Sequence, residues 1–528
     1  MSESSLAGAW RHPPESLRRA CRAVHARQVP LFMAASVAVG AALLFGRLDQ
    51  GWWPHDDGSL AHSAERVLGG ELPHRDFAEL YTGLLTFLNA GVFALLGENI
   101  FNLRLPLFVL FLAFVACFFA IARRVVAPAW AFAATIAAAT WSVPVYPAPM
   151  PSWYLLFLTV FGTYAVVRFL ETRWRPWLFL AGVCGGVGVA IKITGIWFVA
   201  AVCLALLAEA VLDESSGRRV SRWYGALVIA VAAGTLGIAV AIVANLMTAG
   251  NVLGLLVPVA SVSAAVGWLG CRTFRGQARD TPAGRVGDVG LFLVGAVVPM
   301  ALLVAPYAAT SSVDDLVAGV FLGPQSRYEF ASQSLPHPAT LLWALPVVGA
   351  LLVRRKLTVE RRQKLDVAVS ATIAFLLLTA RDTWSYSVIW NATRALAPVL
   401  VCVGAYALVR RSLVSPPHRA TLATLVLVAA FALLVQFPFS APVYFCYVAP
   451  LLLISAIATV RALGLGSGLL PGVLLVALAI FGARELDKQS VLSLGFGYVT
   501  DPQNTTLDST RANIRVRPAA AAEYRRIA

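Results

Sequence analysis

The sequence predicts an all-α fold, a bundle of helices that crosses a lipid bilayer many times. Of its 528 residues, 59% are hydrophobic and only 13% are charged, whereas charged residues make up about a quarter of an ordinary soluble chain. Long uncharged runs occupy residues 30–46, 105–122, 125–167, 223–271 and 289–313. A helix needs about 20 apolar residues to cross the hydrocarbon core, so several runs hold more than one helix.

The first uncharged run follows the polar, Arg-rich residues 1–29 and lacks a convincing small-residue cleavage site after it. We therefore expect a retained first helix rather than a signal peptide, with residues 1–29 as a cytoplasmic tail. The formal charge of +15 fits the Lys and Arg that membrane proteins collect in cytoplasmic loops, so no nucleic-acid partner is expected. The seven cysteines form no CxxC pair, and we expect neither structural zinc nor a disulfide framework.

The breaks between apolar runs alternate between two kinds. The basic kind is cytoplasmic by the positive-inside rule and includes residues 123–124, 168–175, 218–222, 272–285, 354–364, 410–419 and 461. The aromatic and acidic kind is expected outside and includes residues 47–104, 142–152, 309–338, 381–394 and 437–447. This alternation predicts about 13–15 spans within residues 30–483, and an external polar tail at 484–528.

Residues 80–97 are long enough to span, but a span here would put every later basic loop outside. The alternation holds only if this segment lies along the membrane surface or dips back. Its polar positions Thr82, Thr86 and Asn89 fit a helix that lies on the membrane. Residues 47–104 are therefore expected to form one large external loop with two short helices.

The first short helix of this loop has recognisable ends. Asp57 or Ser59 is expected to cap it, and Gly69-Gly70 to end it. Its predicted apolar face consists of Leu60, Ala64, Val67 and Leu68.

The same loop gathers ionisable side chains against apolar helices, which makes it the place to expect chemistry, because charge is costly at membrane depth. These side chains are Asp49, His55, Asp56, Asp57, His62, Glu65, Glu71, His74, Asp76 and Glu79. A solvated acidic loop behind an interfacial aromatic belt is the alternative.

Three pieces of this loop, Trp53–Gly58, Ala64–Gly70 and Leu72–Phe77, resemble the first external loop of the GT-C glycosyltransferases. The closest branch is the dolichyl-phosphate-mannose protein mannosyltransferase-like and aminoarabinose-transferase-like enzymes of bacteria. Further similarity lies in Leu96–Asn99, Leu103–Pro106 and Ala181–Gly195. The resemblance implies a GT-C-type enzyme of the plasma (inner) membrane. Such an enzyme moves a sugar from a polyprenyl-phosphate donor to a glycan, lipid or protein acceptor on the outer face, with inversion.

The resemblance also assigns roles to acidic residues. Asp56 occupies the position of the family's essential acid, where a carboxylate takes the proton of the acceptor hydroxyl. Asp57 is the second catalytic candidate, although as a helix cap it would have only a structural role. Asp76 and Glu79 would orient the acceptor or bind a divalent cation, and Asp76 could instead be a turn residue. Whether a metal is needed stays open.

Cations must receive the negative charge that develops on the departing phosphate. The candidates on the outer side are Lys192, Arg327 and Arg394, and the alternative for each is a side chain that snorkels at a helix end. Two positions depart from the family pattern. Tyr81 stands where relatives carry a lysine, and residues 143–153 contain no acid, which weakens any claim that metal is needed.

A transporter or lipid flippase is the main alternative function, and a catalytically inactive scaffold is another. Transporters usually show internal repeats and functional charges at mid-membrane, whereas this chain shows no repeat and its charges cluster toward one face. Residues 519–528 resemble the start of a helix that is cut off. Since relatives often continue into a further external segment, a truncated product is one interpretation.

Overall fold

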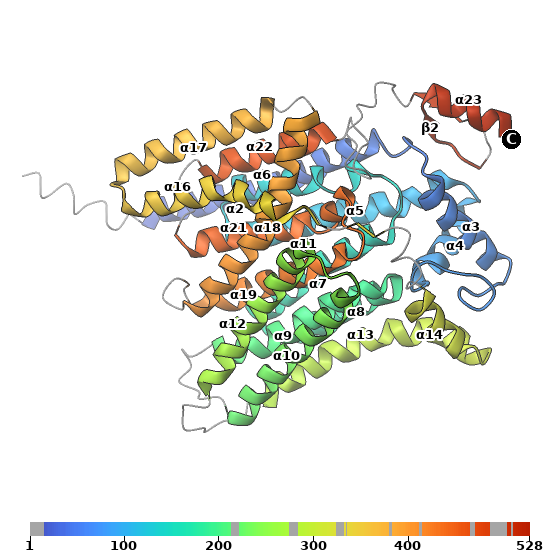
Figure 1. The fold of residues 1–528 in the computed structure, drawn as a ribbon, viewed down its shortest axis with the longest axis horizontal. Coiled ribbons are helices and arrows are strands. Elements are labelled where there is room, and N and C mark those ends of the chain that lie inside the picture. The colour runs from blue at the N-terminus through green and yellow to red at the C-terminus, as the bar shows by residue number, and fades with distance from the viewer. Residues whose placement is uncertain are drawn as a thin grey trace, which may run out of the picture.

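The protein is helical almost throughout in a computed structural model (Figure 1). The structure describes residues 15–212, 221–273, 283–323, 332–333, 335–379, 383–410, 414, 416–464, 470–485, 504–507 and 511–527. Within these ranges the strands are limited to β1 (Thr505–Thr506) and β2 (Arg515–Val516), which pair antiparallel. The predicted all-α class is confirmed.

Nine helical segments of the described chain are long and apolar enough to cross a membrane. They are built on α2 (Glu15–Phe45), α5 (Ile100–Val125), α7 (Pro151–Thr172), α9 (Ile196–Leu212), α10 (Arg222–Val243), α12 (Val257–Thr273), α13 (Ala283–Ala309), α18 (Thr383–Val409) and α19 (Pro416–Ala432). Shorter or more polar helices lie in the same bundle: α6 (Pro128–Thr140), α8 (Pro176–Ile191), α16 (Leu345–Lys356), α17 (Val359–Thr379), α21 (Ala449–Ala462) and α22 (Leu470–Glu485). The polytopic bundle is confirmed, and the total of about 13–15 spans stays a prediction.

Two long uncharged runs each contain more than one helix, as their length predicts. The run 125–167 holds α6 and most of α7, and the run 223–271 holds α10 and α12. Pro128 and Pro151 begin α6 and α7. Proline is tolerated there because the first amide groups of a helix have no intrahelical partner.

Glycines allow α8 and α13 to pack at close range. A Cβ atom added to Gly182 or Gly186 would lie only 2.0 Å from the carbonyl oxygen of Phe292 or Ala296 on α13. Small residues at helix contacts are typical of membrane bundles, where close backbone approach provides the packing energy. This contact fixes α8, and Lys192 is the C-cap residue of that helix.

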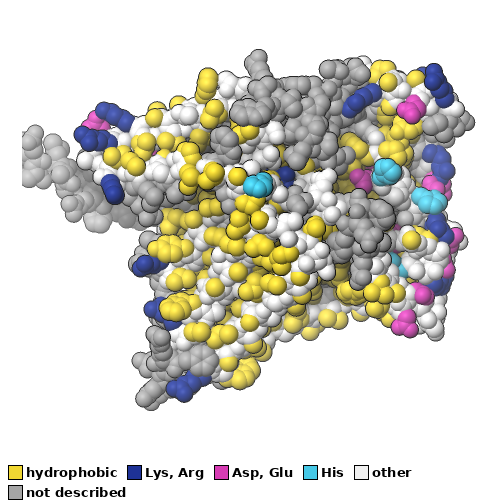
Figure 2. Space-filling model, viewed as in Figure 1, with side chains coloured by type: hydrophobic (Ala, Val, Ile, Leu, Met, Phe, Trp, Pro, Cys, Tyr) yellow, Lys and Arg dark blue, Asp and Glu magenta, His cyan; other side chains and the backbone are white. Residues whose placement is uncertain are grey.

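The two ends of the bundle differ in charge. Figure 2 shows Lys and Arg gathered at the left end, Asp, Glu and His gathered with further Lys and Arg at the right end, and hydrophobic side chains over the middle. The right end carries the first loop, with α3 (Ser59–Leu68) and α4 (Leu84–Leu96). The separation of basic from acidic segments is therefore present in the fold, while its orientation in the membrane stays a prediction.

Helix α4 is shorter than the nine long apolar helices in the described part of the bundle. Its 13 residues extend for about 20 Å, whereas the hydrocarbon core is about 30 Å thick. It packs against α3 through Ala61, Ala64, Ala90 and Phe93. The polar positions Thr82, Thr86 and Asn89 are buried, so they face protein and do not form the water-facing side that a membrane-lying helix would have.

Helix α3 has the predicted end but a different start. Leu60 and Ala64 are buried as predicted, and the C-cap residue is Gly69. The predicted cap at Asp57 or Ser59 is wrong: the N-cap is Gly58, and no side chain caps the helix. The reason is that a π-helical turn, η1 (Pro54–Gly58), already precedes it. Leu68, expected on the apolar face, is 40% exposed.

A C-terminal segment, residues 504–507 and 511–527, packs on the first loop. It contains β1, β2 and α23 (Pro518–Ile527), the helix that residues 519–528 predicted. Its buried residues include Ile514 and Val516, and Trp52 of the first loop packs against this cluster. The first loop is thus held between the bundle and the end of the chain.

Candidate active site

The candidate active site is built on the turn η1, which carries Asp56 and Asp57. Trp53 is extended before the turn, and Pro54 occupies its first position. The two aspartates have different surroundings, because Asp57 is fully buried and Asp56 is half-buried.

Asp57 forms an ion pair with Arg104, a residue of α5, and both side chains are fully buried. Asp57 Oδ2 accepts hydrogen bonds from Arg104 Nη2 at 2.9 Å and from the backbone N of Trp53 at 3.2 Å. Arg104 also donates to the carbonyl oxygens of Leu48 and Gln50, both at 3.0 Å, and of Gly51 at 2.8 Å. The pair therefore fixes the start of the loop on α5, which gives Asp57 a structural role.

Asp56 contacts a tyrosine of the segment 142–152, which joins α6 to α7. The hydroxyl of Tyr146 donates a hydrogen bond to Asp56 Oδ2, and the ring of Trp53 packs edge-on against Tyr146 at 4.5 Å. The indole N–H of Trp153 donates to the Tyr146 carbonyl at 2.9 Å, which fixes this segment on α7. Burial, together with the nearby Asp56 charge, raises the pKa of Tyr146, so the phenol stays protonated and remains a donor.

Lys192 lies at the turn between α8 and α9, as the sequence predicted. Its ammonium group donates to Ser152 Oγ at 2.8 Å and lies 5.8 Å from the ring centre of Tyr81 and 5.3 Å from that of Tyr444. Aromatic faces attract cations. Lys192 therefore places a positive charge beside Tyr81.

One tyrosine cluster, made of Tyr81, Tyr146, Tyr444 and Tyr447, connects the acid with the cation. Tyr444 lies within α20 (Pro442–Cys446), and Tyr447 is the C-cap residue of that helix. Their ring centres are 5.3 Å apart. Burial raises the pKa of Tyr447, and the charge of Asp56 adds to this effect. Segments that are distant in sequence thus bring Asp56 and Lys192 to one cluster at the acidic end of the bundle.

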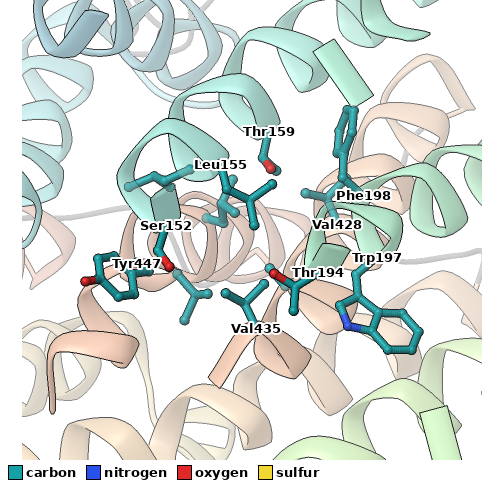
Figure 3. A pocket seen from close by; sticks show the side chains of 13 residues that line it. Ser152, Leu155, Thr159, Thr194, Trp197, Phe198, Val428, Val435 and Tyr447 are labelled. Carbon is teal, nitrogen blue, oxygen red and sulfur yellow. The ribbon is translucent and has the colours of Figure 1, made fainter. Parts of the chain in front are cut away.

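A narrow crevice lies beneath this cluster, between α7, α9, α19 and α21. Figure 3 shows that the polar residues Ser152, Thr159, Thr194 and Tyr447 are interspersed with apolar lining that includes Leu155, Trp197 and Val428. Its volume of about 20 Å³ has room for about one water molecule. Ser152, the hydrogen-bond partner of Lys192, lines this crevice together with apolar residues of the bundle interior.

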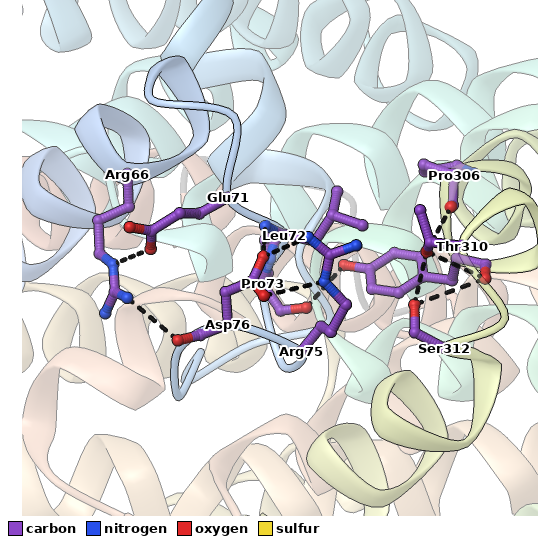
Figure 4. Close-up of polar contacts among 10 residues, drawn as sticks. Arg66, Glu71, Leu72, Pro73, Arg75, Asp76, Pro306, Thr310 and Ser312 are labelled. Atoms are coloured by element: carbon purple, nitrogen blue, oxygen red, sulfur yellow. Dashed lines mark hydrogen bonds and ion pairs between the residues drawn. The ribbon is translucent and has the colours of Figure 1, made fainter.

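The Asp76 carboxylate makes its hydrogen bonds within its own turn, while the Asp76 carbonyl oxygen accepts from Arg66 Nη2 at 3.0 Å (Figure 4). The carboxylate accepts from the backbone N of Leu72 at 2.7 Å and from Arg75 Nε and Nη2 at 2.9 and 2.6 Å. These bonds, with the Arg75 guanidinium contributing most, lower the pKa of the Asp76 carboxyl. The geometry is that of the turn residue considered as the alternative role.

Glu79 is also engaged by its neighbours. Its carboxylate accepts from the backbone N of Leu80 at 2.7 Å, from that of Tyr81 at 3.2 Å and from Thr86 Oγ1 at 2.8 Å. It thereby orders the approach to α4. Among the described residues, no group of three or more His, Cys, Asp or Glu side chains is arranged to hold a metal ion.

Of the other predicted phosphate contacts, Arg327 lies outside the described residues. Arg394, on α18, is 3% exposed and donates from Nη2 to the carbonyl oxygen of Ser440. Its Nε is buried without a hydrogen-bond partner in the described structure. Ser440 belongs to the segment 437–447, which the sequence predicts to be external, so Arg394 contacts the segment that also carries Tyr444 and Tyr447.

The sequence did not single out Tyr146, Ser152, Tyr444 or Tyr447. One signal was available. The segments 142–152 and 437–447 are rich in aromatic residues, and their alternation with the basic loops predicts that they lie on the same side of the membrane as 47–104. From the sequence, Arg104 was recognised only as part of the stretch Leu103–Pro106. Its partner could not be found from the sequence, because 47 positions separate it from Asp57.

A multi-span helical bundle with a half-buried acid and a lysine at one end is consistent with a membrane enzyme. In the comparison with known families, residues 84–251 match the model of dolichyl-phosphate-mannose-protein mannosyltransferase. The resemblance to GT-C membrane glycosyltransferases is confirmed by this match. The matched region includes Tyr146, Ser152 and Lys192 and begins after Asp56.

No curated protein matches the chain. Among solved structures, the chain is similar to the crystal structure of the Archaeoglobus fulgidus oligosaccharyltransferase in the apo form, with 14% sequence identity and a TM-score of 0.39. The alignment covers 88% of this chain and 56% of that one.

Proposed function

We propose that the protein is a membrane glycosyltransferase that transfers a sugar from a polyprenyl-phosphate donor to a glycan, lipid or protein acceptor of the cell envelope, with inversion. The observation that carries the proposal is the convergence of an acid and a cation. Asp56 accepts a hydrogen bond from Tyr146, and Lys192 lies over Tyr444, within one tyrosine cluster.

Asp56 is the proposed general base. An acceptor hydroxyl becomes a good nucleophile when a positioned carboxylate takes its proton. The acceptor oxygen then bonds to the anomeric carbon as the bond from that carbon to the phosphate oxygen breaks. A direct inverting displacement needs one base, whereas a retaining hydrolase needs two carboxylates about 5 Å apart. Asp57 is paired with Arg104, which leaves Asp56 for this role.

Lys192 is the proposed stabiliser of the leaving phosphate. Its ammonium group is half-buried between Tyr81 and Tyr444, and a cation in a place sheltered from water stabilises developing negative charge more strongly than one in water. Arg394 is a second candidate, because it is buried against the segment 437–447 and has an unused buried Nε.

A lipid-borne donor suits the position of this site. The acid and the lysine lie at the acidic end of the bundle, which the positive-inside rule places on the external side, away from nucleotide sugars. The described part of the chain contains no α/β domain of the kind that binds nucleotides at its strand ends. The hydrophobic middle of the bundle (Figure 2) offers a surface for a polyprenyl chain.

The buried carboxylates of the described spans do not favour a transporter. Glu209 pairs with Arg173 and Arg285, and Asp288 pairs with Arg285 and Arg175. Glu209 lies near the end of α9 and Asp288 near the start of α13. These charges join neighbouring helix ends, whereas transport sites usually lie at mid-membrane on broken helices.

The proposal is tested with the purified full-length chain in liposomes and a radiolabelled sugar. Transfer is expected from a polyprenyl-phosphate sugar and not from UDP- or GDP-sugars. Addition of EDTA shows whether a divalent cation takes part. From the sequence, we expect Asp76 and Glu79 either to bind such a cation or to orient the acceptor. Efficient transfer from a nucleotide sugar without a lipid carrier would contradict the proposal, and movement of the intact lipid without transfer would favour a flippase.

A further inference from the structure

The C-terminal segment is joined to the first loop by backbone hydrogen bonds. The backbone N of Arg515 donates to the carbonyl oxygen of Asp49 at 2.6 Å, and the backbone N of Gly51 donates to that of Arg515 at 2.9 Å. At the other side of the loop, the backbone N of Ile100 donates to the carbonyl oxygen of Arg511 at 3.0 Å. The segment therefore bridges the two ends of the first loop.

Side-chain ion pairs reinforce this attachment. Arg515 binds Asp49 with two nitrogens, at 2.7 and 2.6 Å. Arg511 binds both Glu65, on α3, and Glu98, just before α5, the latter at 2.8 Å. Because two-point arginine–carboxylate contacts are geometrically specific, these pairs define how the segment lies on the loop.

A cavity of about 220 Å³ lies between the segment and the loop. Its wall combines the indole of Trp52 with the polar side chains of His62, Glu65, Glu98 and Arg511. Pockets for drug-sized ligands measure roughly 300–1,000 Å³, so this cavity suits a smaller molecule.

The cavity and Tyr146 lie on different sides of the turn that carries Asp56. Trp53 packs against Tyr146, the partner of Asp56, while its neighbour Trp52 lines the cavity and contacts Tyr524 of the C-terminal segment. Gly58, the last residue of η1, is also part of the cavity wall. A ligand here would lie beside the proposed base without occupying its site.

We propose that this cavity binds one neutral pyranose ring of a saccharide acceptor, remote from the ring that receives the transferred sugar. An indole supplies a flat apolar surface for the C–H face of a sugar. Carboxylates accept, and a guanidinium donates, hydrogen bonds to its hydroxyl groups. Glu65 and Glu98 outnumber Arg511, so the excess negative charge disfavours sugars that carry a carboxylate or phosphate.

The acceptor role rests on the proposed function, but sugar binding does not, so it is measured without any donor. The purified full-length chain in detergent is titrated with methyl β-D-glucopyranoside and, separately, with methyl β-D-glucuronide, and binding is followed by saturation-transfer NMR. The variants are Trp52→Leu, which removes the ring, and His62→Ala, which changes an exposed side chain of the cavity wall. The matched control is Glu71→Gln, in the same loop and outside the cavity wall.

Saturable glucoside binding is expected, weaker by roughly tenfold in Trp52→Leu, weaker in His62→Ala, and unchanged in Glu71→Gln. The glucuronide is expected to bind more weakly than the glucoside. Absence of saturable glucoside binding, equal binding by both cavity variants and the wild type, or equal binding of the glucuronide would overturn the inference. Glucoside binding by a protein that fails the lipid-donor assay would instead contradict the proposed function and leave the sugar site in place.

Discussion

The hydroxyl of Tyr146 donates a hydrogen bond to the carboxylate of Asp56, although 90 positions separate the two residues. A donor at this point holds the carboxylate in one orientation. Tyr146 is therefore a positioning residue for the proposed base.

Tyr146→Phe should lower the rate of transfer by roughly tenfold, because hydrogen bonds to charged groups contribute about 1.5–3 kcal/mol. Initial rates of transfer at equal amounts of folded protein measure the loss. A rate equal to that of the wild type would show that Tyr146 has only a packing role.

Arg104→Leu should destabilise the protein strongly, by about 3–5 kcal/mol, because it leaves the buried carboxylate of Asp57 without its cation. Thermal unfolding in detergent measures this loss. Asp57→Asn leaves the buried guanidinium of Arg104 without its anion and should also destabilise the protein. It should cost less, because Arg104 still donates to three backbone carbonyl oxygens and to the amide oxygen of the asparagine. The control is Lys364→Met, which breaks the exposed pair with Glu360 and should cost at most about 1 kcal/mol.

The same variants distinguish the two aspartates. If Asp57 only supports the fold, the remaining activity of Asp57→Asn should follow the amount of folded protein. A folded Asp57→Asn protein that has lost transfer would instead assign the chemistry to Asp57.

Lys192→Met should lower kcat/KM for the lipid-phosphate donor by roughly 100-fold and leave the KM for the acceptor unchanged, because the leaving phosphate loses its cation. Lys192→Arg, which keeps the charge, should lose less. Initial rates at varied donor and acceptor concentrations separate the two effects. Equal rates for Lys192→Met and the wild type would remove Lys192 from the mechanism.

The turn around His74 should loosen in acid. Burial lowers the pKa of His74 below its ordinary value of 6.5, although the nearby Glu79 charge opposes the shift. The folded state thus favours the neutral ring. Its contribution to stability is complete above about pH 6.5 and is lost as the pH falls from there toward the lowered pKa, because the unfolded chain binds the proton first.

Hydrogen–deuterium exchange of residues 72–83 at pH 7.5 and 5.5 measures this effect when it is expressed as protection factors, which remove the pH dependence of intrinsic amide exchange. His74→Asn should remove the pH dependence, and asparagine tolerates the left-handed backbone at this position, where φ is 65°. Exchange that is equally pH-dependent in His74→Asn would exclude His74 as the cause.

The sequence predicted the helical bundle, the large first loop and the turn at Lys192, because long apolar runs and segregated charges are local signals. It also predicted that 80–97 does not cross the membrane; this stays a prediction, and the helix found there, α4, has 13 residues. The start of α3 was wrong, since the π-helical turn at Pro54–Gly58 has no clear pattern in composition.

The site was predictable only in part. Asp56 and Lys192 belong to recognisable motifs, and both contact the tyrosine cluster. The partners Tyr146, Ser152, Tyr444 and Tyr447 come from loops whose meeting depends on how the helices pack. The buried pair of Asp57 with Arg104 likewise depends on tertiary contacts, and so does the docking of the C-terminal segment.

The most direct test of the account is the initial rate of sugar transfer from a polyprenyl-phosphate donor by Asp56→Asn in liposomes, compared with the wild type at equal amounts of folded protein. Asparagine keeps an oxygen that can accept from Tyr146 but cannot take a proton. The account predicts a loss of roughly 10²–10⁴-fold, the contribution typical of a general base. A rate close to that of the wild type would contradict the assignment of Asp56 as the base.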